Sequence, residues 1–159
     1  MAGAGAHDGR TSAPPRSGWA RLVVELHVND LAVSLSFWQG VLAFGVAFDR
    51  PEERFVYLEH AEGHQIMLCQ RHGRFETGPL DHPLGQGAMF QLYFADIAPV
   101  LTALAERDWP IYLGPREVWR ATGDHESGLR EFFVQDPDGY LLMVAENIGR
   151  RPLQGPAVT

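Results

Sequence analysis

Two short stretches of the sequence place polar side chains on every second residue. Glu25 and His27 share one side of a predicted strand, because alternate residues of a strand point the same way, and Gln91 and Tyr93 occupy the equivalent positions in a second stretch. A carboxylate, an imidazole, an amide and a phenol beside apolar neighbours are the usual lining of a ligand pocket. Imidazole can act as a general base near neutral pH, but we expect neither a nucleophile nor a metal ion beside His27. We therefore expect it to be a hydrogen-bonded pocket histidine.

Aromatic side chains are the second set of candidate ligand contacts. Phe55 and Tyr57 lie on one side of a predicted strand that would form a wall of the pocket. Trp119 and Arg120 follow a predicted loop, where binding residues concentrate, and Phe132 lies on a later strand. Stacking and cation–π contacts with such rings can hold a planar or cationic ligand without any chemistry.

A repeated order of strand and helix positions these candidates. Residues 22–28 alternate as a half-buried strand, and Asp30 then caps a predicted helix whose apolar stripe contains Trp38 as a core residue. The same order returns in residues 89–104, with Asp96 as the cap. Further strands are predicted after each helix, at 44–49, 54–59 and 65–70 in the first half, and near 111–113, at 119, at 130–135 and at 140–146 in the second.

The closing strands of the two halves also match, and the match gives the domain organisation. The second half is about ten residues longer, which we assign to a loop at 121–128, and the turn Asp136–Gly139 precedes its last strand. The sequence therefore predicts an α+β fold of two βαβββ modules in one domain. The expected boundaries are a disordered leader at 1–18, a domain at 19–147 with modules at about 21–71 and 86–147, and a C-terminal tail at 148–159.

Composition narrows the possible partners. The formal net charge is -7 and all 13 basic residues are arginine, which argues against nucleic acid or an anionic membrane as partner and favours a cationic ligand. Cys69 is the only cysteine, so no intramolecular disulfide and no multi-cysteine metal site can form. The chain has no apolar run long enough to span a membrane. We expect a cytoplasmic protein.

Several motifs together resemble a known superfamily between residues 21 and 146. They are Val24–Leu31 with Ser34, Phe37, Trp38 and Leu42, then residues 50–55, Trp119–Arg120, and residues 130–139. Their order is similar to that of the vicinal oxygen chelate superfamily (glyoxalase, bleomycin resistance protein, dioxygenase), in its bleomycin-resistance-like branch. The resemblance implies cup-shaped mixed sheets with helices outside, and a homodimer with ligand-binding grooves between its subunits. Exposed sheet edges and an open face, which a lone chain of this size covers poorly, favour a dimer as well.

The enzymes of this superfamily bind a divalent metal through the first and last strands of each module, usually with His and Glu. The resemblance assigns these four positions to Val23, Met67, Met89 and Met143. Valine and thioethers cannot hold a hard catalytic ion, so we expect no metal and no other cofactor, with the three methionines as apolar lining of the pocket. A shifted register that used Glu25, His27 or His64 would find no matching His or Glu in the second half.

These expectations favour a binding protein over an enzyme. The main hypothesis is a metal-free small-molecule binding protein, without catalytic residues, that sequesters a cationic or aromatic antibiotic-like ligand in a dimer cleft. One alternative is a metal-dependent lyase or isomerase of glyoxalase type, or a dioxygenase. Another is a sensor or partner-binding module whose pocket holds a metabolite or nothing.

Overall fold

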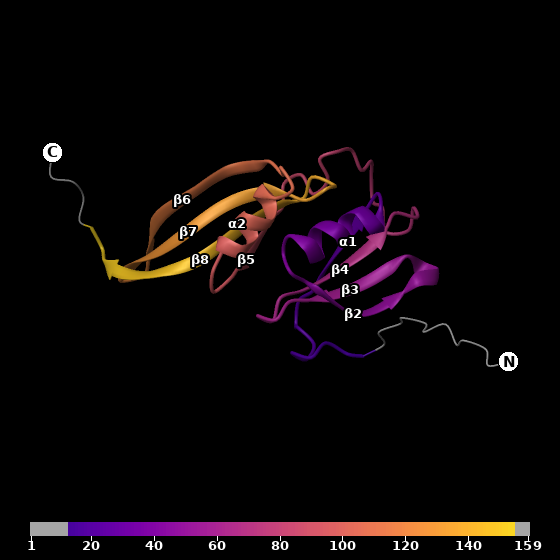
Figure 1. The fold of residues 1–159 in the computed structure, drawn as a ribbon, viewed down its shortest axis with the longest axis horizontal. Coiled ribbons are helices and arrows are strands. Elements are labelled where there is room, and N and C mark those ends of the chain that lie inside the picture. Colours follow the sequence, from indigo (N-terminus) through magenta and orange to yellow (C-terminus); the bar gives the residue numbers. More distant parts are fainter. Residues whose placement is uncertain (1–12, 155–159) are drawn as a thin grey trace.

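The computed structural model describes residues 13–154, so residues 1–12 of the predicted leader and 155–159 of the predicted tail lie outside the described part. Two modules follow one another along the chain, the first coloured indigo to magenta and the second orange to yellow in Figure 1. The elements are β1 (Val24–Val28), α1 (Leu31–Gly40), β2 (Gly45–Arg50), the short 3-10 helix η1 (Pro51–Glu53), β3 (Phe55–Glu59), β4 (Gln65–Gln70), β5 (Met89–Tyr93), α2 (Ala98–Ala105), β6 (Ile111–Thr122), β7 (His125–Gln135) and β8 (Leu141–Pro152).

Each module contains one four-stranded mixed sheet. The strand orders are β1-β4-β3-β2 and β5-β8-β7-β6. In both sheets the opening strand runs parallel to the closing strand, and the remaining pairs are antiparallel. The predicted α+β fold of two βαβββ modules is therefore confirmed.

The helices begin where polar side chains satisfy free backbone N–H groups. The carboxylate of Asp30 accepts a hydrogen bond from the backbone N–H of Val33 at 3.1 Å, so Asp30 is the predicted cap of α1. Asp96 accepts in the same way from Ala98 at 2.8 Å, but α2 begins only at Ala98, after Ile97. The N-cap residue of α2 is therefore Ile97, and Asp96 lies one residue further from the helix than the repeat predicts.

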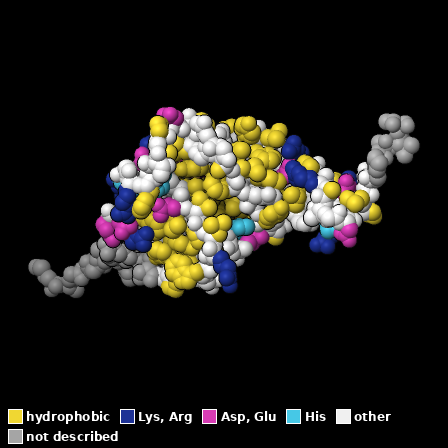
Figure 2. All heavy atoms as spheres, turned by 180° about the vertical axis from the view of Figure 1, so that it is seen from behind, with side chains coloured by type: hydrophobic (Ala, Val, Ile, Leu, Met, Phe, Trp, Pro, Cys, Tyr) yellow, Lys and Arg dark blue, Asp and Glu magenta, His cyan; other side chains and the backbone are white. Residues whose placement is uncertain are grey.

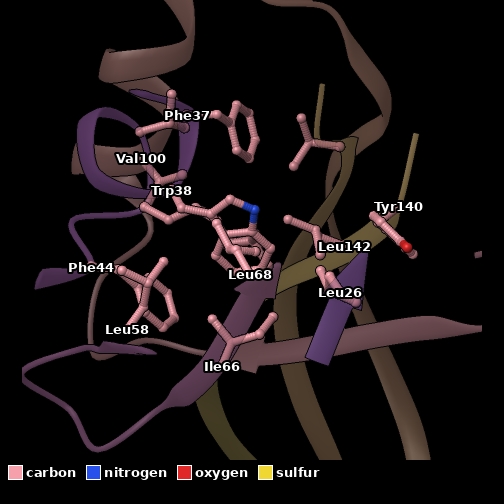
Figure 3. Packing of buried hydrophobic residues seen from close by; sticks show 14 of the residues in the cluster. Leu26, Phe37, Trp38, Phe44, Leu58, Ile66, Leu68, Val100, Tyr140 and Leu142 are labelled. Carbon is pink, nitrogen blue, oxygen red and sulfur yellow. The ribbon is translucent and has the colours of Figure 1, made fainter. Parts of the chain in front are cut away.

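One hydrophobic core joins the two modules. Trp38 of α1 is fully buried in this core, as predicted, and packs edge-on against Phe44. Figure 3 shows Trp38 in one cluster with Leu68 of the first sheet and Leu142 of the second. Because one side of each sheet contributes to this cluster, the opposite sides are left free to form binding faces.

Equivalent residues of the repeat also tie the modules together in a reciprocal way. Asp138, in the turn before β8, accepts a hydrogen bond from the backbone N–H of Asn29 at 2.9 Å, and the Tyr140 hydroxyl donates to the carbonyl oxygen of His27 at 2.9 Å. In the other module, Glu62 accepts from the backbone N–H of Ala95 at 2.9 Å, and Nε2 of His64 donates to the carbonyl oxygen of Tyr93 at 2.6 Å. Each closing turn thus holds the end of the other module's opening strand.

The first of these junctions contains buried carboxylates. Asp138 also accepts from the buried hydroxyl of Ser34 at 3.0 Å, and Asp136 accepts from Nε1 of Trp38 at 3.2 Å. Burial raises the pKa of Asp136 to about 6, because desolvation outweighs the hydrogen bonds that it accepts. The turn motif that marked the end of the repeat is therefore also the main polar contact between the modules.

Three predicted boundaries are wrong. Residues 121–128 do not form a loop: β6 and β7 continue through them and meet at a tight hairpin around Gly123 and Asp124. The second sheet is also longer than expected, because β8 extends through Pro152 into the predicted tail. Within the predicted leader, residues 13–18 have a defined place, since the side chain of Gln65 hydrogen-bonds to Ser17 and Gly18.

No helix in residues 13–154 is long and apolar enough to cross a membrane.

Candidate functional site

The side of the first sheet turned away from α1, here called the module-one face, contains the first group of predicted site residues. Leu26 and Val28 point into the shared core, so Glu25 and His27 point the other way, as the alternation predicts. Nε2 of His27 lies 3.2 Å from Oε1 of Glu25, and the imidazole is near the ring of His72. The pair is partly exposed, so a ligand on this face would meet a carboxylate and an imidazole together.

Aromatic rings form a row beside this pair. Phe48 and Tyr57 are stacked with ring centroids 4.9 Å apart and an interplanar angle of 18°. The row continues to Phe55, whose ring is covered by the guanidinium of Arg50 at 3.9 Å. Phe55 and Tyr57 are themselves buried, so a planar ligand can gain dispersion and cation–π contacts only at an exposed end of the row.

The N-terminal segment adds a residue that the sequence did not indicate. Trp19 is mostly exposed, and its ring meets Phe48 and Tyr57 edge-on at 5.9 and 5.5 Å. Gln65 fixes the segment because its side chain also accepts from the backbone N–H of Ala20 at 2.9 Å. The isolated tryptophan at the end of a Gly, Ala, Ser and Pro stretch was the only available signal.

A pocket of about 460 Å³ opens at the polar end of the module-one face. Glu25, Phe55, Cys69 and His72 line it together with Arg50, Glu52, Glu53, Arg54, Arg74 and Phe75. Burial and the neighbouring Glu25 raise the pKa of the Cys69 thiol, so it remains protonated near neutral pH. The pocket therefore offers charge and hydrogen bonds rather than an activated nucleophile.

The corresponding side of the second sheet, the module-two face, contains the remaining predicted residues in a separate pocket. Leu92 packs against the shared core, which turns Met89, Gln91 and Tyr93 outward, and Gln91 lies beside Met143 on β8. The pocket measures about 480 Å³ and is lined by Met89, Gln91, Tyr93, Arg120, Thr122, Ser127, Leu129, Phe133, Met143 and Asn147. Seen from behind, the molecule has a broad hydrophobic area across its middle, with charged side chains mainly toward the margins (Figure 2).

Two predicted contact residues lie on neither face. Phe132 is fully buried in the shared core, and its neighbour Phe133 lines the module-two pocket instead. Trp119 points to the opposite side of the second sheet, where its ring packs over Gly128 and under the guanidinium of Arg151, 4.4 Å from the ring centroid. Arg120, the next residue, does line the module-two pocket.

The positions that the resemblance assigns to metal ligands have both apolar and polar neighbours. Met67 lies beside Glu25 in the sheet and packs in a small cluster with Val23, whereas Met143 packs with Leu129. His64 is committed to the junction between the modules and does not approach Glu25 and His27 as a third donor. In residues 13–154, no group of three or more His, Cys, Asp or Glu side chains is arranged to hold a metal ion.

A second group that sequence reasoning missed surrounds Glu131 on the module-two face. This carboxylate is fully buried and accepts hydrogen bonds from Arg116 and Arg120. The spacing of the two arginines, four residues apart, puts them on one side of a strand. That signal was hidden because residues 114–118 did not read as part of a strand.

Comparisons with known proteins agree with this architecture. The family model of the Glyoxalase/Bleomycin resistance protein/Dioxygenase superfamily matches residues 21–144. A superfamily member from Vibrio splendidus is 36% identical, over 78% of this chain and 95% of that chain, with a TM-score of 0.33. No curated protein matches the chain.

Two other solved structures, at lower sequence identity, share the fold. A virulence protein from Salmonella typhimurium is 23% identical, over 82% of this chain and 98% of that chain, with a TM-score of 0.60. A lactoylglutathione lyase from Agrobacterium tumefaciens is 20% identical, over 84% of this chain and 95% of that chain, with a TM-score of 0.51. With the family model covering most of its length, the chain belongs to the glyoxalase/bleomycin resistance protein/dioxygenase superfamily.

Proposed function

We propose that this protein is a small-molecule binding protein that holds an aromatic or cationic ligand in a cleft between two copies of the chain. The observation that carries the proposal is the aromatic row on the module-one face, where Trp19 contacts the stacked pair Phe48 and Tyr57, and Phe48 also contacts Phe55. Trp19 is exposed at one end of the row, so a planar group can stack there. Affinity from stacking needs no catalytic group.

Charge on the same face supports a cationic group in the ligand. Glu25 points out of the sheet beside the row, and its only side-chain partner within the described chain is His27. A cation placed on an aromatic surface gains cation–π attraction as well as the field of a nearby carboxylate. A ligand that combines a planar ring with an amine or guanidine would use both features.

The separation of the two pockets supports a homodimer. Each pocket is open, and the module-one and module-two faces line different pockets of one chain. If the module-one face of one copy met the module-two face of another, two closed clefts would form, and the exposed side chains of Met89 and Tyr93 would be covered. Sequestering a toxic compound in such clefts, in the cytoplasm, is the antibiotic-resistance role that we propose.

The metal that enzymes of the superfamily use does not fit the residues of this chain. Val23 and three methionines stand where His and Glu ligands are implied, and thioethers do not bind hard divalent ions. Glu25 and His27 supply two donors on the module-one face, but the adjoining Met67 supplies none that suits such an ion. We therefore propose no metal-dependent reaction.

Ligand titration tests the proposal directly. Bleomycin, a cationic glycopeptide, and ethidium, a planar cation, would be added to the full chain while tryptophan fluorescence is followed. We expect saturable quenching by at least one of them, and weakening by tenfold or more in Trp19→Ala, because that substitution removes the accessible end of the row. Trp119→Ala, on the opposite side of the second sheet, is the matched control and should leave affinity unchanged.

The alternative is a metal-dependent lyase or isomerase of glyoxalase type, or a dioxygenase. Metal analysis of protein purified without an affinity tag separates the two hypotheses. We expect well under one equivalent of Zn, Ni, Fe or Mn per chain. One tightly held equivalent that a chelator removes together with an activity would establish the enzyme instead.

A further inference from the structure

The buried carboxylate of Glu131 holds two arginine side chains in fixed positions on the module-two face. Arg120 donates from Nη1 and Nη2 at 2.8 Å each, and Arg116 donates from Nε and Nη2 at 3.1 and 3.0 Å. These hydrogen bonds, chiefly that of Arg120, lower the pKa of Glu131 and keep the carboxylate ionised at neutral pH. Both guanidiniums are therefore oriented before any ligand arrives.

Two cations around one anion leave an excess of positive charge on this face. The side chain of Glu131 has 0% of its surface exposed, whereas those of Arg116 and Arg120 are 44% and 47% exposed. A guanidinium has five N–H donors, and Arg120 uses only two of its nitrogens on Glu131, so its Nε–H and the second hydrogen of each Nη remain available. Among the described residues that line the module-two pocket, Arg120 is the only charged one.

The other side of the same sheet provides a contrast. Arg130 lies between Glu146, at 2.7 Å, and Glu117, at 3.3 Å, so one cation there faces two carboxylates. Arg130 is as exposed as Arg120, at 47%. If arginine served only to neutralise a buried acid, a single guanidinium would satisfy Glu131. Because both Arg116 and Arg120 pair with Glu131, the group carries one net positive charge beside the open module-two pocket.

We propose that the module-two pocket contains an anion subsite in which Arg120, held by Glu131 and reinforced by Arg116, binds a carboxylate or phosphate group of the ligand. Planar guanidinium donors match both oxyanions in geometry. The apolar walls formed by Met89, Met143 and Phe133 suit a ring attached to that group. This subsite rests on the proposed function only because it places its occupant in the same cleft. The subsite on the module-two face and Glu25 on the module-one face together specify a ligand that is acidic at one end and aromatic or cationic at the other.

Methionine methyl groups provide a site-resolved measurement. Met89 and Met143 line the module-two pocket, whereas Met67 lies on the module-one face. The full chain would be labelled with ¹³C-methyl methionine and titrated with benzoate, phenyl phosphate, benzyl alcohol and benzylamine. We expect benzoate or phenyl phosphate to shift the Met89 and Met143 signals more than that of Met67, with dissociation constants at least tenfold lower than for the neutral and cationic probes. Comparing benzoate with phenyl phosphate identifies which oxyanion the subsite prefers.

Matched substitutions decide whether the oriented guanidinium is responsible. Arg120→Gln should weaken the better anionic probe by at least tenfold, whereas Arg130→Gln, which makes the same change in net charge on the other side of the sheet, should weaken it less than twofold. If Arg120→Gln fails to fold because Glu131 loses a partner, the double variant Arg120→Gln/Glu131→Gln removes the guanidinium and the buried acid together. Binding must be lost in that variant too.

Three results would overturn the subsite: equal shifts with benzylamine and benzoate, equal losses in the Arg120 and Arg130 variants, or no shift of Met89 and Met143 at tens of millimolar of either anion. None of them affects the titration of cationic ligands at the aromatic row, so the proposed function can stand while the subsite falls. Conversely, anion-dependent shifts at Met89 and Met143 without any binding of bleomycin or ethidium would keep the subsite and reject the proposed ligand class.

Discussion

Neighbouring residues of β1 have opposite roles, which makes the orientation of the whole site testable with two substitutions. Glu25 is partly exposed on the module-one face, whereas Leu26 is buried in the shared core. Glu25→Gln should leave the fold intact and weaken a cationic ligand by about 1–3 kcal/mol, the range for loss of a charge-assisted hydrogen bond. Leu26→Ala should cost roughly 2–5 kcal/mol of unfolding free energy, with the affinity of the folded molecule nearly unchanged.

Thermal unfolding and ligand titration of both variants give the answer. A Glu25→Gln protein that unfolds, beside a stable Leu26→Ala protein, would show that the inward and outward sides of β1 are reversed. The residues of the module-one face and the module-two face would then have to be reassigned, because the equivalent strand β5 follows the same alternation.

Strict alternation explains which site residues the sequence could predict. It predicted the side of the sheet on which Glu25, His27, Gln91 and Tyr93 lie, because β1 and β5 are short and free of register shifts. It could not place Trp119, since β6 has two register shifts before Arg116, and each one breaks the counting of sides along the strand. Adjacent apolar residues such as Phe132 and Phe133 give no indication of which one faces the core.

At the level of elements, the turn between β7 and β8 links pH to stability. The pKa of Asp136 is about 6 in the folded protein, against 3.8 for an ordinary aspartate. The folded state therefore keeps a proton that the unfolded state releases, so this group's contribution to stability is present below about pH 4 and is lost as the pH rises toward 6. A shift of this size corresponds to roughly 3 kcal/mol.

Urea unfolding at several pH values between 4.5 and 6.5 measures this effect. We expect the unfolding free energy of the wild type to fall with pH relative to that of Asp136→Asn, which cannot titrate. The asparagine variant also changes the hydrogen bond with Trp38, but that loss does not depend on pH. Parallel pH curves for the two proteins would show that Asp136 titrates normally.

The long hairpin of β6 and β7 shows why the sequence did not predict the full length of these two strands. Strand prediction relies on one side of a strand being apolar, and in residues 120–128 charged and polar side chains occupy both sides of the sheet. The remaining elements were predictable because each rests on the shared core through an apolar side, as α1 does through Phe37 and Trp38. Pairing with β8, rather than hydrophobic burial, stabilises the outer part of the hairpin.

For the whole molecule, the proposed dimer predicts that a charge on the module-two face separates the subunits. The side chain of Met89 is 47% exposed in the single chain, and that of Val33, on the outside of α1, is 51% exposed. Sedimentation should find a dimer of the wild type at tens of micromolar, dissociation by Met89→Arg, and no effect of Val33→Arg. A monomeric wild type would remove the cleft between copies from the proposed function.

The reciprocal contacts between closing turns and opening strands have a consequence for how the molecule unfolds. Asp138 holds the end of β1, Glu62 holds the start of the segment after β5, and Trp38 lies in a core built from both sheets. Neither half therefore encloses a complete hydrophobic interior, although each has a full set of strands and a helix. The repeat is visible in the sequence as two units, but because they share one core we expect the two halves to unfold together as one cooperative unit.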